Sequence, residues 1–192
     1  MSTQKLALFV FIIYLVIYTC ILIILKSKIK GYSIHKHVVS LLGVEKPPFG
    51  HIFNLSTIIY GLLSFSMISP LLNQYGNNPL VILGIISLIS TGVATILVGI
   101  FPMNIPRAHK FVSYYVFSSV LVTGIIFTPI FITYGLSKFM IWLSIWTILS
   151  TFLLSMVALV EKRTNSFLEW SNLFYTILWN FSFAYMLFRG IA

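Results

Sequence analysis

Apolar residues dominate six long stretches of the chain, and short polar segments separate these stretches. The stretches are residues 6–25, 51–72, 80–101, 111–134, 139–160 and 170–188. Each has about the 20 residues that an α-helix needs to cross the hydrocarbon core of a bilayer. The pattern therefore predicts an all-α fold: a polytopic membrane protein built as a bundle of six transmembrane helices.

The connections between the apolar stretches leave no room for a further folded domain. The longest connection covers residues 26–50 and contains Gly and Pro residues typical of turns. We therefore expect residues 1–192 to form a single transmembrane domain. A polar, basic segment, with no small-residue cleavage site, follows the first stretch, which indicates a retained helix rather than a signal peptide.

The composition agrees with a membrane protein and narrows the chemistry. Hydrophobic residues make up 59% of the chain and charged residues 8%, and the mean hydropathy is +1.02. Soluble proteins have roughly 25% charged residues. Cys20 is the single cysteine and lies within the first apolar stretch, so neither a disulfide framework nor a thiolate metal cluster is expected.

The net charge of +9 is distributed unevenly between the two ends of the predicted bundle. The first, third and fifth connections hold nine of the twelve Lys and Arg residues: Lys26, Lys28, Lys30, Lys36, Lys46, Arg107, Lys110, Lys162 and Arg163. The other end holds Lys5, Lys138 and Arg189. Short basic loops mark the cytoplasmic face. We therefore expect these connections to face the cytoplasm and both termini to lie outside. A basic inner face beside anionic lipid requires no nucleic-acid partner.

The other ionisable side chains share the basic end. They are the three acids Glu45, Glu161 and Glu169 and the four histidines His35, His37, His51 and His109. No charged residue or histidine lies near the middle of a predicted span, which is unlike ion-coupled pumps. Most of these side chains are explained by anchoring at lipid headgroups. His51, His109, Glu161 and Glu169 each border a helix, however, and a carboxylate beside an imidazole is suited to proton transfer.

Three kinds of site can be considered for these residues. Haem ligation would need two facing histidines, for which His51 and His109 are the candidates. Zinc would have only His and Glu ligands, since the sequence lacks an HExxH motif and paired cysteines. A hydrolase could use Ser40, His109 and Glu169, but no GxSxG motif supports it. We therefore predict neither a metal nor a cofactor.

Three sequence blocks stand out along the chain: SLLGVEKPPFGHIFNLSTIIYG, VGIFPMNIPRAH and FLEWSNLFYTILWNFSFAYML. Together, and in this order, they resemble the DUF998 family of prokaryotic membrane proteins. The resemblance implies a protein of the plasma membrane of a prokaryote. The family resembles, more distantly, the Frag1/DRAM group of six-helix membrane proteins. Its motif positions correspond here to Ser40, Gly43, Pro48, Asn54, Gly61, Gly99, Phe101, Pro102, His109, Glu169, Tyr175 and Trp179.

Three positions depart from the family's pattern. Leu41 stands where the resemblance implies Asp, Trp170 where it implies Arg, and Thr176 where it implies Pro. An acid–base mechanism that relied on that Asp or Arg is not available to this chain. The resemblance therefore favours a role without catalysis.

The second and third blocks predict where a polar site lies. Gly99 and Pro102 should end the third helix, and Pro106 should restrict the turn before His109 begins the fourth. His109 and Glu169 are thus expected to share one polar pocket at the cytoplasmic mouth of the bundle. Asn54, one turn inside the second helix, is expected to bond to a neighbouring helix.

The resulting functional hypothesis is a non-catalytic membrane protein that binds lipid or a membrane-protein partner at this interface. One alternative is an enzyme that modifies lipid headgroups with His109 and Glu169. Another is a translocator of lipid or a neutral solute along stripes of hydroxyl side chains, such as Ser144, Thr147 and Thr151 of the fifth span. Packing between helices also explains such stripes.

Overall fold

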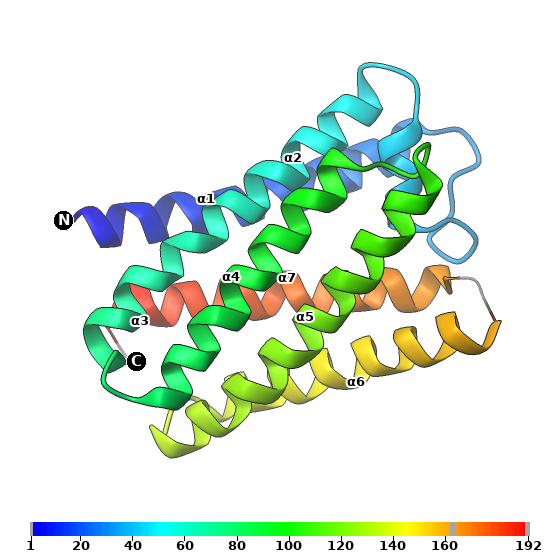
Figure 1. Cartoon of the computed structure of the whole chain (residues 1–192). Coiled ribbons are helices and arrows are strands. Elements are labelled where there is room, and N and C mark those ends of the chain that lie inside the picture. Colours follow the sequence, from blue (N-terminus) through cyan, green and yellow to red (C-terminus); the bar gives the residue numbers. More distant parts are fainter. Residues whose placement is uncertain (1, 162–163, 191–192) are drawn as a thin grey trace.

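Long helices run side by side along most of the chain (Figure 1). The computed structural model describes residues 2–161 and 164–190, and all regular structure in these residues is helical. The α-helices are α1 (Thr3–Lys28), α2 (Phe49–Ser64), α3 (Ile68–Tyr75), α4 (Pro79–Ile100), α5 (Pro106–Thr133), α6 (Lys138–Glu161) and α7 (Ser166–Arg189). The 3-10 helices are η1 (Val39–Val44) and η2 (Phe65–Met67). The predicted all-α membrane fold is confirmed.

Five segments of the described chain are long and apolar enough to cross a bilayer. They are α1, the segment Phe49–Tyr75 that contains α2 and α3, α4, α5 and α6. The sixth predicted span, residues 170–188, lies within α7, which packs against α1 and α6. Buried Asn172 and Asn180 make α7 more polar than the other long helices, and both amides have partners inside the bundle.

The second predicted span is interrupted where the sequence pattern indicated one helix. The α-helical hydrogen bonds of α2 end at Ser64, and η2 joins α2 to α3. Pro70 lies in the first turn of α3 and has no N–H to donate to the Ser66 carbonyl. The missing bond explains why the helix tightens just before this proline.

Glycines bring α2 and α4 into close contact. A Cβ atom added at Gly61 would lie 2.7 Å from the Gly92 carbonyl oxygen, and one added at Gly99 would lie 2.6 Å from the Asn54 carbonyl oxygen. Neither helix has space for a larger side chain at these points. Large apolar side chains face outward instead, as Leu55 and Trp142 do with 59% and 58% exposure. This distribution is typical of helices that pack in lipid.

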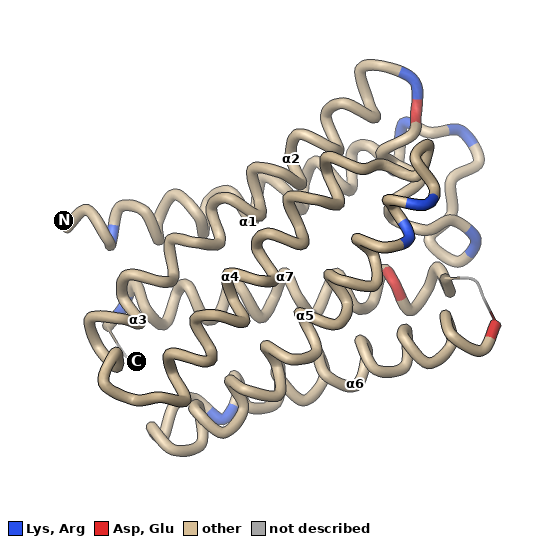
Figure 2. Tube along the Cα trace, viewed as in Figure 1, with Lys and Arg blue, Asp and Glu red and all other residues tan. Residues whose placement is uncertain are grey.

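Charged residues gather at one end of the bundle. Figure 2 shows most of them around the α1–α2 connection, the α4–α5 turn and the start of α7, with few at the opposite end. We refer to the charge-rich end as the basic end. Lys162 and Arg163, which belong to the predicted basic set, lie outside the described residues.

Candidate functional site

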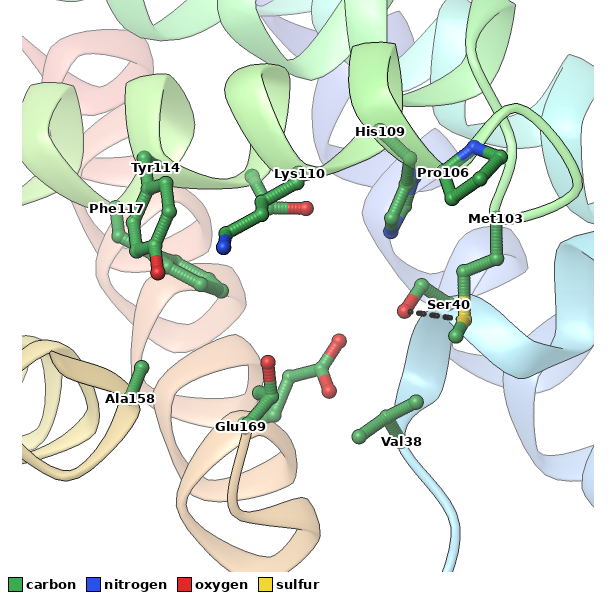
Figure 3. A pocket seen from close by; sticks show the side chains of 12 residues that line it. Val38, Ser40, Met103, Pro106, His109, Lys110, Tyr114, Phe117, Ala158 and Glu169 are labelled. Carbon is green, nitrogen blue, oxygen red and sulfur yellow. Dashed lines mark hydrogen bonds between the residues drawn. The ribbon is translucent and has the colours of Figure 1, made fainter. Parts of the chain in front are cut away.

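A cavity of about 310 Å³ lies at the basic end, between η1, the start of α5, the end of α6 and the start of α7. We call it the basic-end cavity. Its lining residues are Val38, Ser40, Met103, Pro106, His109, Lys110, Ser113, Tyr114, Phe117, Ala158, Thr164 and Glu169. In Figure 3 the side chains of Ser40 from η1, His109 and Lys110 from α5, and Glu169 from α7 point into the same space.

The turn between α4 and α5 fixes the position of His109. The α4 helix ends at Ile100, and α5 begins at Pro106. His109 Nδ1 lies 2.8 Å from the Phe101 carbonyl oxygen. A carbonyl can only accept, so Nδ1 carries a proton, and Nε2 is an acceptor whenever the ring is neutral. The turn thus holds a nearly buried imidazole, 9% exposed, with a defined tautomer at the cavity wall.

Glu169 enters the cavity from the opposite side. It lies in the first turn of α7, just before the apolar segment 170–188, and Asn165 caps this helix by accepting from the Leu168 amide at 3.2 Å. Its Oε2 atom is buried, with no hydrogen-bond partner among the described residues. Burial raises the pKa of Glu169 to about 7, although hydrogen bonding from the Ser40 and Val39 amides and the Ser40 hydroxyl opposes the rise.

Side chains from both neighbouring helices hold η1, which carries Ser40, against the bundle. Asn54 Nδ2 of α2 donates to the Gly43 carbonyl at 3.0 Å. Trp170 Nε1 of α7 donates to the His37 carbonyl at 3.2 Å, just before η1. The expected bond from Asn54 to a neighbouring helix is therefore replaced by one to this connection, because η1 folds over the end of α2.

Ser40 has two acceptors within reach. Its hydroxyl lies 3.3 Å from the Met103 sulfur and also borders the Glu169 carboxyl. A hydroxyl has one proton, and a carboxylate is a stronger acceptor than a thioether. The Ser40 hydroxyl can therefore donate to Glu169 when the carboxyl is ionised, and to the Met103 sulfur when the carboxyl is neutral.

Two smaller cavities lie deeper in the bundle, and each shares wall residues with the one before it. The second, about 100 Å³, shares Ser40, Phe117 and Glu169 with the first and has mainly apolar walls. The third, about 20 Å³, shares Val120 and Thr176 with the second. The three cavities form a series that narrows away from the basic end.

The geometry does not correspond to a catalytic triad. Ser40, His109 and Glu169 line one cavity, but His109 Nδ1 is bonded to a carbonyl rather than to a carboxylate. Within residues 2–161 and 164–190 no hydrogen bond joins Ser40 to His109 and no ion pair joins His109 to Glu169. A Ser-His-acid mechanism needs both links.

The arrangement also separates the residues considered for a cofactor or a metal. His51 is exposed and does not line the cavity that contains His109, so the two histidines do not form a haem-binding pair there. Glu161 is exposed at the end of α6 and does not line this cavity either. The described residues contain no group of three His, Cys, Asp or Glu side chains suited to a metal ion.

The remaining motif residues lie away from the cavity. Gly43, Gly61 and Gly99 are at close contacts between segments. Trp179 Nε1 donates to Ser144 Oγ at 2.8 Å, and Tyr175 stacks on Trp146 with ring centroids 6.0 Å apart. Pro48 precedes α2 and Pro102 lies in the α4–α5 turn, where both act on the backbone. These positions act on helix packing and on the backbone of the connections.

Sequence reasoning missed several residues of the cavity wall. Lys110 was interpreted only as one of the charges at the headgroup level, and Met103, Ser113 and Tyr114 were not singled out. A signal for part of this wall was present, because residues four apart share a helix face and His109, Ser113 and Phe117 follow that spacing. The contribution of Met103 depends on the fold of the turn.

The fold and the cavity define a helical integral membrane protein with a polar cavity near one end of its bundle. The chain matches the family described as "Protein of unknown function (DUF998)" over residues 11–185 and belongs to that family. The resemblance of the three sequence blocks is thereby confirmed, while the relation to the Frag1/DRAM group stays a prediction. No curated protein and no solved structure matches the chain.

Proposed function

We propose that this protein binds a membrane phospholipid by its headgroup in the basic-end cavity, without chemical conversion of the lipid. The observation that carries the proposal is that a polar cavity lies next to an apolar one. The cavity holds Lys110 and His109 beside the hydroxyls of Ser113 and Tyr114. The second cavity, which shares wall residues with it, is mainly apolar. A phospholipid has the same order of a charged headgroup and an apolar chain.

The cationic wall of the cavity fits a phosphate. Lys110 points into the cavity from α5 in Figure 3, with its Nζ atom 5.9 Å from the centre of the Tyr114 ring. An ammonium group can give a phosphate charge-assisted hydrogen bonds, which are stronger than neutral ones. The volume of about 310 Å³ lies at the lower end of the range of ligand pockets, roughly 300–1,000 Å³.

The narrowing of the cavities favours binding over translocation. The third cavity, at about 20 Å³, has space for about one water molecule and none for a lipid chain. A translocator would need a wider path through this part of the bundle. The missing hydrogen bonds of a triad likewise favour binding over hydrolysis.

Replacing Lys110 with Met tests the proposal. Loss of a charge-assisted hydrogen bond costs roughly a factor of ten in affinity. We expect the variant to retain about tenfold less phospholipid than the wild type. The measurement is native mass spectrometry after release from nanodiscs of equal parts phosphatidylethanolamine, phosphatidylcholine and phosphatidylglycerol.

Arg107→Met is the matched control. Arg107 lies on the same turn of α5 as Lys110 and is likewise exposed, but it does not line the cavity. It should retain as much phospholipid as the wild type. Equal loss in both variants would assign the effect to general surface charge, and unchanged retention in Lys110→Met would contradict headgroup binding in this cavity.

The basic end is proposed to face the cytoplasm, with both termini outside. The proposal rests on the excess of Lys and Arg in the connections at that end. Single cysteines at Ser27 and Asn77, both exposed and at opposite ends of the bundle, should react oppositely in intact cells of a Cys20→Ser background. A membrane-impermeant maleimide should label position 77 alone. Labelling of position 27 alone would reverse the orientation.

A further inference from the structure

The Glu169 carboxyl is the feature of the basic-end cavity that phosphate binding does not explain. A phosphate bears the same charge as an ionised carboxylate, so the two groups repel. Oε2 of Glu169 is nevertheless buried at the cavity without a hydrogen-bond partner in the part of the chain that the structure describes. A buried, unpaired carboxylate oxygen is costly unless a donor reaches it.

The part of the chain that the structure describes supplies no cation that pairs with Glu169. Within the described residues no Lys, Arg or His forms an ion pair with Glu169. The groups that face it are the Ser40 hydroxyl from η1, Tyr32 from the α1–α2 connection, and His109, Lys110 and Tyr114 across the cavity. In Figure 3 the carboxyl of Glu169 and the ammonium of Lys110 stand on different walls, with the cavity between them.

This separation of charge matches a zwitterionic headgroup. A phosphate near Lys110 places the rest of the headgroup toward Glu169. A choline group carries positive charge but has no N–H to donate, and a glycerol group can donate but carries no positive charge. A primary ammonium supplies both the charge and the hydrogen that Oε2 lacks.

Resting on the proposed function, we infer that Glu169 selects a phospholipid whose headgroup ends in a primary ammonium, as in phosphatidylethanolamine. The ammonium donates to Oε2, while the phosphate lies at the Lys110 wall. Glu169 thus determines which lipid is retained, and Lys110 determines how much phospholipid is retained.

The test is a competition among headgroups. Wild-type protein is reconstituted into nanodiscs of equal parts phosphatidylethanolamine, phosphatidylcholine and phosphatidylglycerol, released, and examined by native mass spectrometry. We expect phosphatidylethanolamine to exceed each of the other lipids about tenfold, which corresponds to one charge-assisted hydrogen bond. Glu169→Gln, which keeps the shape but removes the charge, should bring the ratio close to one.

Glu45→Gln is the matched control. Glu45 lies at the same end of the bundle, between η1 and α2, and does not line the cavity. Its substitution should leave the preference for phosphatidylethanolamine unchanged. A preference that survives in Glu169→Gln, or disappears equally in Glu45→Gln, would overturn the role of Glu169.

A second measurement on the wild type covers the case in which Glu169→Gln does not fold. The carboxyl is charged above its pKa of about 7 and neutral below it. Binding an ammonium stabilises the charged form and lowers that pKa in the complex, so the preference should fall several-fold between about pH 8 and about pH 5. All three lipids contain the phosphate. Protonation of groups that contact the phosphate therefore affects them equally and cancels in the ratio of retained phosphatidylethanolamine to the other two lipids.

The outcomes separate this inference from the proposed function. Equal retention of the three lipids, or a preference for phosphatidylcholine or phosphatidylglycerol, overturns ammonium selection and leaves headgroup binding in place. A ratio that does not change with pH also overturns it. Wild-type protein that retains no phospholipid contradicts the proposed function, and the inference falls with it.

Discussion

Trp179→Ala is expected to lower the free energy of unfolding by about 3–5 kcal/mol, the cost of removing a buried tryptophan. Trp179 is 4% exposed and lies against three phenylalanines of the core, with ring centroids 5.5 Å from Phe127, 6.0 Å from Phe131 and 5.1 Å from Phe183. Its indole N–H also bonds to Ser144. The substitution leaves a void and an unpaired hydroxyl between α5, α6 and α7.

Two comparisons separate the packing of Trp179 from its hydrogen bond. Trp179→Phe keeps most of the volume and should cost about 1 kcal/mol, close to the value of the lost bond. Trp142→Ala removes an indole that is 58% exposed on the lipid-facing side and should cost much less than Trp179→Ala. The measurement is reversible unfolding by SDS titration in mixed micelles. A cost for Trp179→Ala no larger than for Trp142→Ala would contradict the packing described.

Gly61→Val is expected to destabilise the protein by about 1–3 kcal/mol, the usual cost of overpacking, or to prevent folding. The added Cβ would lie 2.7 Å from the Gly92 carbonyl oxygen and 3.0 Å from the Ile96 amide nitrogen. Both are backbone atoms of α4, so relief requires movement of a whole helix. Contact between backbones replaces the hydrophobic driving force that helices lack in lipid.

Leu62→Val is the control for Gly61→Val. It introduces the same β-branched side chain one position later on α2, where the native leucine is 52% exposed. We expect a change within about 0.5 kcal/mol, as for surface substitutions generally. Thermal unfolding in detergent compares the two variants. Equal destabilisation by both would assign the effect to β-branching in α2 rather than to its contact with α4.

The architecture could be predicted from the chain because bilayer thickness fixes the length of an apolar run. The lengths of the six stretches reflect that constraint directly. The 3-10 turn at η2 was not predicted, since Pro70 also occurs in patterns that continue as an α-helix. Local chemistry limits such a position to a few conformations, and the surrounding packing decides among them.

The candidate site was predictable in part. Pro102 and Pro106 indicated a rigid turn that positions His109. The family resemblance and its position at the start of a helix indicated Glu169. The volume of the cavity and the participation of Met103 could not be predicted, because a void is what remains after side chains from four elements have packed. The burial of Glu169 likewise depends on η1, a segment with no periodic signal in the sequence.

The contact between α2 and α4 also has a mechanical consequence. Helices whose backbones touch cannot separate or slide without opening empty space between them, so this pair should move as one rigid body. The basic-end cavity is walled instead by η1, α5, α6 and α7. Any widening that admits a ligand must therefore come from movement of α5, α6 or α7 relative to this pair, because the Asn54–Gly43 bond also ties η1 to α2.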